Sequence, residues 1–253
     1  MVTVVPTLQR MADIYRLPRE GGAKSPRFTA YHKVVGDVWG MSPSNPMAGP
    51  HAFEAVEGLL ALGAEAITAE AAREVVERLH HAGEVTLAVV LAAPGMWTDR
   101  VANEVRHRTI DERRPGHGIV LQWTRELPTL GGVRREAMAE AIRVAWTAVH
   151  GPARTVRAVL GREGLAYALD EAPFAEMSEQ ERTALDNALQ IIGDSTAPSE
   201  IVAIAHGDDA AVALGYSPLG LAVLAGVRWA SARAREAVAQ QGAPRVLATW
   251  ASA

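Results

Sequence analysis

Val85–Leu91, with the sequence VTLAVVL, is the most informative segment of this chain for its fold. The segment is continuously apolar and rich in β-branched residues, with Gly83 before it and Pro94-Gly95 after it. An apolar run of this length between turn residues is typical of a strand that is buried on both faces. We therefore predict a buried strand of a parallel sheet at residues 85–91.

Similar patterns extend to both sides of this segment. Gly118–Trp123 and Ile201–Ala205 are further strand candidates, and Val2–Val5 and Arg245–Trp250 are candidate edge strands. Helical patterns lie between and around them, at Leu8–Leu17, Arg27–Trp39, Pro50–Leu60, Ala69–His81 after a capping Thr68, Thr98–Arg108, Val133–Val149, Pro152–Leu160, Glu179–Ile192 and Pro218–Ala239. Strands that alternate with helices predict an α/β layered fold, with a mainly parallel sheet of four or five strands flanked by helices. The alternative is an all-α fold, because short apolar runs in an alanine-rich chain also occur in buried helices.

The domain organisation follows from a change in composition near residue 50. Residues 1–50 are predicted to form an N-terminal helical arm and a Pro/Gly-rich loop, and residues 51–253 the α/β domain. No strand pattern interrupts residues 151–195, which are therefore a candidate helical cap. The loop at Met41–Pro50 is either a lid over a binding site or a connector, since long ordered loops are often functional.

Composition narrows the function classes. The 253-residue chain has a net charge of −4, no cysteine and only two lysines, Lys24 and Lys33. Thiolate catalysis, disulfides and cysteine-ligated metals are excluded. The acidic balance gives no reason to expect a nucleic-acid or membrane partner, and no apolar run reaches the roughly 18 residues of a membrane helix. We expect a cytoplasmic protein, and the arginine and alanine bias is typical of GC-rich bacterial genomes.

Three polar segments follow predicted strands, and ligands of parallel sheets bind at the carboxyl ends of strands. His206, Asp208 and Asp209 after Ile201–Ala205 are the candidate catalytic group, as general acid and base or as ligands of a divalent metal. Gly-Asp-Asp is also ordinary turn chemistry. The candidate substrate-binding residues are Asp99, Arg100, Trp123 and Arg125 at strand ends, and Ser44 and Asn45 in the loop.

A different constellation favours a metal protein. Glu77 with His80 and Glu104 with His107 form two Glu-x-x-His pairs, as in helical di-metal carboxylate proteins. The same residues also fit ordinary surface pairs on helices. Phosphate-binding, dinucleotide-binding and nucleophile-elbow motifs are absent from the sequence.

The function expected from these patterns is that of a hydrolase or lyase acting on a small polar or anionic substrate by acid–base chemistry at the strand ends. The alternatives are a non-catalytic small-molecule binding or sensing domain and a metal protein that uses the Glu-x-x-His pairs. The apolar segment Leu219–Trp229 predicts either a buried core helix or the interface of a homo-oligomer.

Overall fold

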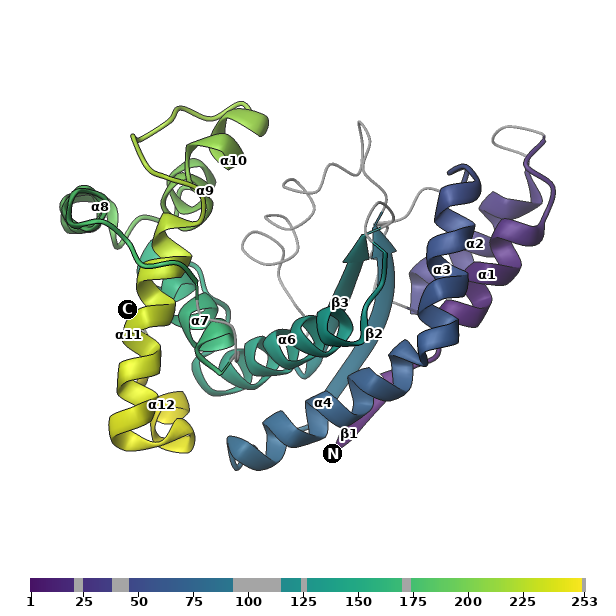
Figure 1. Ribbon diagram of the computed structural model, residues 1–253, viewed down its shortest axis with the longest axis horizontal. Coiled ribbons are helices and arrows are strands. Elements are labelled where there is room, and N and C mark those ends of the chain that lie inside the picture. The colour runs from purple at the N-terminus through teal and green to yellow at the C-terminus, as the bar shows by residue number, and fades with distance from the viewer. Residues whose placement is uncertain (21–24, 38–45, 93–114, 124–126, 170–173, 252–253) are drawn as a thin grey trace.

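The structure is a computed structural model that describes residues 1–253 except 21–24, 38–45, 93–114, 124–126, 170–173 and 252–253. A small sheet lies between two groups of helices (Figure 1). The N-terminal half contains β1 (Val2–Val5), α1 (Leu8–Arg16), α2 (Pro26–Asp37), α3 (Pro50–Leu62), α4 (Ala64–Arg78), β2 (Val85–Ala92) and β3 (His117–Trp123). The C-terminal half contains α6 (Leu130–His150), α7 (Val156–Ala168), α8 (Glu179–Ile192), α9 (Pro198–His206), α10 (Asp208–Ala213), α11 (Ala225–Gln241) and α12 (Ala243–Thr249).

The sheet is parallel, and its strand order is β1-β2-β3. Val2 is paired with Val85 at the start of β2, and Ala92 is paired with Trp123 at the end of β3. The prediction of a parallel sheet around Val85–Leu91 is therefore confirmed, as are strands at Val2–Val5 and Gly118–Trp123. The fold is mixed α/β: most residues are helical, and they accompany this small sheet.

The two faces of β2 are both buried. Leu87, Val89 and Leu91 belong to the main core, where α4 and α6 pack against the sheet. Ala88 and Val90 form a second cluster with Ile119, Leu121 and Trp123 of β3. Burial on both sides explains why this strand is continuously apolar and does not alternate with polar residues.

The prediction of strands at Ile201–Ala205 and Arg245–Trp250 is wrong. Both segments are helical: the first lies in α9, and the second lies in α12 except for Trp250, which follows that helix. Pro198 begins α9, and all five residues from Ile201 to Ala205 are buried, so their apolarity reflects a helix enclosed on every side. The predicted number of four or five strands is therefore too high: within the described residues, the sheet has three strands.

Several helix boundaries also differ from the predictions. Thr68 does not cap a helix, because α4 begins at Ala64 and Thr68 is buried inside it. Gly63, with φ of 68°, ends α3 and begins α4 in a left-handed conformation that favours glycine. Helix α11 begins at Ala225 and not at Pro218, and the helix predicted at Thr98–Arg108 lies outside the described residues.

The long helix α6 joins the sheet to the C-terminal helices. It packs against β3, α4 and α7, and α7 in turn packs against α9 and α11. Gly164 on α7 allows a close approach to α11, because a Cβ atom there would lie 2.8 Å from backbone atoms of Ala230. No helix in the described ranges is long and apolar enough to cross a membrane.

A buried network of charged side chains lies at the contact between α6 and α7. The Arg143 guanidinium donates from Nε to Glu163 Oε2 at 2.9 Å and forms a 3.3 Å ion pair with Glu140. Arg162 pairs with the other Glu163 oxygen at 2.9 Å. Glu140 also accepts the Ile119 backbone N–H, so the network ties both helices to β3. Each charge has an opposite partner, which offsets the cost of removing it from water.

Candidate functional site

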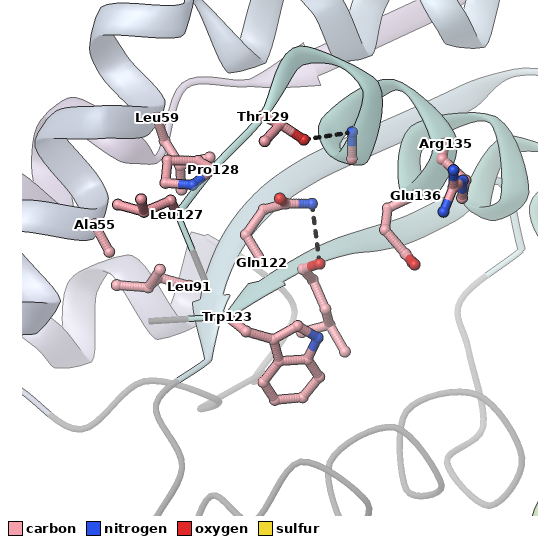
Figure 2. A pocket seen from close by; sticks show the side chains of 12 residues that line it. Ala55, Leu59, Leu91, Gln122, Trp123, Leu127, Pro128, Thr129, Arg135 and Glu136 are labelled. Carbon is pink, nitrogen blue, oxygen red and sulfur yellow. Dashed lines mark hydrogen bonds between the residues drawn. The ribbon is translucent and has the colours of Figure 1, made fainter. Parts of the chain in front are cut away.

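A pocket lies at the carboxyl ends of β2 and β3, against the first turns of α6 (Figure 2). Its volume is about 170 Å³. Helix α3, the two strands, the segment before α6 and α6 itself supply the lining residues, which are Ala55, Leu59, Leu91, Leu121, Gln122, Trp123, Leu127, Pro128, Thr129, Gly132, Arg135 and Glu136. The pocket therefore occupies the position at which open parallel sheets bind their ligands.

The lining of this strand-end pocket divides into an apolar and a polar side. Ala55, Leu59, Leu91 and Pro128 lie together on one side in Figure 2, and the side chains of α6 lie on the other. Because Leu59 and Leu91 are almost fully buried, the surface that the pocket offers to a ligand is mainly polar.

Gln122 lies between the two sides and is 9% exposed. Its Nε2 group donates a hydrogen bond to the backbone oxygen of Leu121 at 3.0 Å. Within the described part of the chain, its Oε1 atom has no hydrogen-bond partner. This oxygen is not fully buried, so it is open to solvent and can accept a hydrogen bond from a ligand N–H or O–H group.

The start of α6 forms the upper wall of the pocket in Figure 2. Thr129 is the N-cap, and its side chain accepts the Gly132 backbone N–H at 3.0 Å. The first turn has no acidic residue, so no side chain there offsets the partial positive charge of the helix N-terminus. Arg135 and Glu136 follow one turn later and add one formal charge of each sign.

The predicted substrate-binding residues have different outcomes. Trp123 ends β3, is buried and lines the pocket. Asp99, Arg100, Arg125, Ser44 and Asn45 lie outside the described residues. Of this group, the structure thus describes only Trp123, at the strand end where the sequence predicts it.

The predicted catalytic group does not lie at a strand end, because the segment before it is helix α9. His206 is buried at the end of α9, and Gly207 has a φ of 86°. The Asp208 carboxylate accepts the backbone N–H groups of Leu219 and Gly220 at 2.8 and 2.9 Å. Asp209 is exposed in the first turn of α10.

These contacts give Asp208 a structural role, which is to hold the loop after α10. Figure 1 shows α9 and α10 among the C-terminal helices, away from the sheet. The structure therefore does not bring His206, Asp208 and Asp209 to the pocket. Among the described residues, no group of three His, Asp or Glu side chains is arranged to hold a metal ion.

The two Glu-x-x-His pairs are only half described. Glu77 and His80 are exposed at the end of α4, whereas Glu104 and His107 lie outside the described ranges. The neighbouring His81 is partly buried, and burial followed by the nearby Met1 amino group lowers its pKa.

A second hollow, of about 320 Å³, lies between α4, α6 and α7. Arg78, Arg134 and Arg135 line it, and Glu74 on its rim is paired with Arg134. Both members of that pair are partly exposed, and the hollow lies between helices and not at the carboxyl ends of the strands, where parallel sheets bind ligands. We therefore take the strand-end pocket as the candidate site.

Sequence reasoning missed Gln122, Thr129, Arg135 and Glu136. The sequence does contain a signal for Thr129. This residue follows a predicted strand and precedes Gly131-Gly132 and a long helical pattern. A capping residue between a strand and a helix marks the helix N-terminus that faces a strand-end ligand. Gln122 has no such signal, because its burial depends on α6 packing beside it.

Comparisons with known proteins give no match for this chain. No protein-family model, no curated protein and no solved structure matches it. The function is therefore inferred from the pocket and its residues.

Proposed function

We propose that this protein binds a small polar or anionic molecule in the strand-end pocket. The observation that carries the proposal is the position of Gln122, a nearly buried side chain whose amide oxygen faces a cavity between two parallel strand ends and a helix N-terminus. Two further kinds of polar group line the same pocket: the N-terminal turn of α6, and the charged side chains of Arg135 and Glu136.

A hydrolase or lyase is the second candidate function, with a different residue as acid or base. Among the described lining residues, Glu136 is the one carboxylate of this pocket, and the lining includes no histidine. General acid–base chemistry needs a titratable group within hydrogen-bond reach of the reacting atom. Glu136 takes this role in the catalytic version of the proposal, in place of His206, Asp208 and Asp209.

The proposal is tested by measuring ligand-induced shifts in Tm over a panel of small carboxylates, phosphates, amides and amino acids. We expect at least one compound to raise the Tm of the wild-type protein, and Gln122→Leu and Arg135→Gln to reduce that shift. Arg73→Gln is the matched control, because Arg73 is an exposed arginine of α4 outside the pocket lining. Equal shifts in all four proteins would show that the ligand binds elsewhere.

Catalysis is distinguished from binding by following the chemical fate of a bound compound. If Glu136 is the acid or base, Glu136→Gln loses turnover by roughly a hundredfold or more, which is a larger loss than the change in its Tm shift. An unchanged compound after incubation with the wild-type protein supports the binding function alone.

A further inference from the structure

We propose that the hollow between α4, α6 and α7 is a second binding site, for an organic anion that has an apolar body and a carboxylate or phosphate head group. This site is separate from the strand-end pocket, so the proposal does not depend on the function proposed for that pocket. Three observations carry it: an excess of arginine in the lining, an arginine without a partner, and a partly exposed apolar surface in the same hollow.

The charge of the lining favours an anion. Arg78 ends α4, and Arg134 and Arg135 lie in the first two turns of α6. Glu74 is the one acidic side chain among the described lining residues, which therefore carry two more positive than negative charges. Because these positive charges repel one another, an anion that enters the hollow lowers the electrostatic energy of the whole group.

Arg78 is the cation that is available to a ligand. Its side chain is exposed, and within the described residues its guanidinium group takes part in no hydrogen bond or ion pair. Arg134 is paired with Glu74 through one nitrogen, Nη2, so its other N–H groups can still donate. A planar guanidinium group matches two oxygens of a carboxylate or of a phosphate, so both arginines suit a head group of either kind.

The apolar surface of the hollow comes from α6 and α7. Met138 and Tyr167 pack on the main core and are partly exposed in the lining. The Tyr167 ring has a fixed place, because the Arg143 guanidinium lies 5.2 Å from its centroid and the Phe174 ring centroid lies 5.3 Å from it. An apolar group placed against Met138 and Tyr167 loses contact with water without losing hydrogen bonds. A small inorganic anion would leave this surface uncovered.

The size of the hollow limits the apolar body. Its volume of about 320 Å³ lies at the lower end of the range that is typical of small-molecule sites. An apolar cavity of about 150 Å³ holds benzene, so a hollow of about twice that volume holds a molecule of roughly a dozen non-hydrogen atoms. Octanoate and octyl phosphate are probes of this size.

The test compares octanoate, octyl phosphate, octan-1-ol and acetate by isothermal titration calorimetry on the full chain. We expect both octyl anions to bind about fivefold more tightly than octanol, because one exposed ion pair contributes up to roughly that factor. Acetate should bind at least about tenfold more weakly than octanoate, since it lacks the apolar body. The comparison of octanoate with octyl phosphate identifies the preferred head group. A higher salt concentration should weaken the binding of octanoate and leave that of octanol unchanged, because salt screens exposed charges.

The variant Arg78→Gln should lose most of the preference for octanoate over octanol. The matched control is Arg73→Gln, because Arg73 is also an exposed arginine of α4 without a partner among the described residues, but it lies outside the lining. Circular dichroism checks that both variants fold. Equal preferences in Arg78→Gln and Arg73→Gln would overturn the assignment of Arg78, and equal affinity for octanoate and either octanol or acetate would overturn the ligand class.

Gln122→Leu separates this site from the strand-end pocket. We expect its affinity for octanoate to equal that of the wild-type protein, because Gln122 does not line the hollow. A loss of octanoate binding in this variant would place the anion in the strand-end pocket and overturn the second site. If neither octyl anion binds, the second site fails, whereas the function proposed for the strand-end pocket stands or falls by its own panel of ligands and variants.

Discussion

His81 illustrates how a single side chain couples the fold to pH. Its ring packs on Gly83, where a Cβ atom would lie 2.5 Å from Nε2, and within the described residues this buried nitrogen has no hydrogen-bond partner. Burial, and then the Met1 amino group, lowers the pKa of His81 below its usual value of 6.5. Because the pKa is lower in the folded state, the unfolded state binds the proton more tightly.

This difference predicts that acidification destabilises the protein through His81. The contribution of His81 to stability is complete above pH 6.5 and is lost as the pH falls through the folded-state pKa. Urea unfolding at pH 8 and pH 5 should therefore show a smaller pH dependence in His81→Asn than in the wild-type protein. The control His80→Asn changes an exposed neighbour whose φ of 50° asparagine tolerates. Equal pH dependence in the wild-type protein and His81→Asn would contradict the assignment.

At the scale of one element, helix α8 depends on its N-terminal cap. The Ser178 hydroxyl accepts the Glu181 backbone N–H, and the Glu181 carboxylate accepts the Ser178 backbone N–H at 2.7 Å. Arg228 of α11 also reaches Glu181 at 3.1 Å. The hydrogen bonds from the Ser178 backbone and hydroxyl, and then Arg228, lower the pKa of Glu181. The cap is therefore fully formed at a pH above the usual pKa of a glutamate carboxyl group. It weakens as the pH falls through the lowered pKa of Glu181.

We expect Ser178→Ala to destabilise α8 by about 1 kcal/mol, the usual cost of losing a helix cap. Hydrogen exchange of the first α8 amides at neutral pH measures the effect, and exchange should accelerate there before it does in α6 or α7. Gln180→Ala, an exposed change in the same turn, serves as the control. Unchanged exchange in Ser178→Ala would mean that Arg228 and packing hold the helix without the cap.

The same scale shows which elements the sequence could predict. Val85–Leu91 and Ile201–Ala205 are both short, apolar and rich in β-branched residues, yet the first is a strand and the second is a helix. Each is buried on all sides, so neither has the periodic polar positions that distinguish a strand from a helix. Pro198, at a distance suited to a first helical turn, is the local signal that favours a helix in the second segment.

At the scale of the whole molecule, the buried ion network connects the sheet half to the helical half. Arg143 on α6 and Glu163 on α7 are at most 1% exposed, and both oxygens of Glu163 are paired with arginines. Removing the charge of Glu163 leaves two buried guanidinium groups with one carboxylate, Glu140, to compensate them.

We therefore expect Glu163→Gln to lower the free energy of unfolding by roughly 3–5 kcal/mol. Chemical denaturation measures the loss, with the exposed Glu179→Gln as the control, for which we expect a change within about 0.5 kcal/mol. A loss of similar size in both variants, or in neither, would show that the network does not hold the two halves together.

Local sequence patterns were sufficient to predict the central parallel strands, most of the helices and the edge of the sheet at which the candidate pocket lies. Those features are local, since they follow from apolar periodicity, from turn residues and from the rule that parallel strands place their carboxyl ends together. Trp123 belongs to this group, because it directly follows a strand pattern.

The number of strands and most residues of the candidate site depend instead on tertiary packing. His206, Asp208 and Asp209 lost their expected place because the segment before them is a helix that packs with α10 and α11. Gln122, Arg135 and Glu136 belong to the candidate site because the first turns of α6 lie beside the strand ends and supply one wall of the pocket. Burial and proximity between segments distant in sequence arise from packing, which a local pattern does not encode.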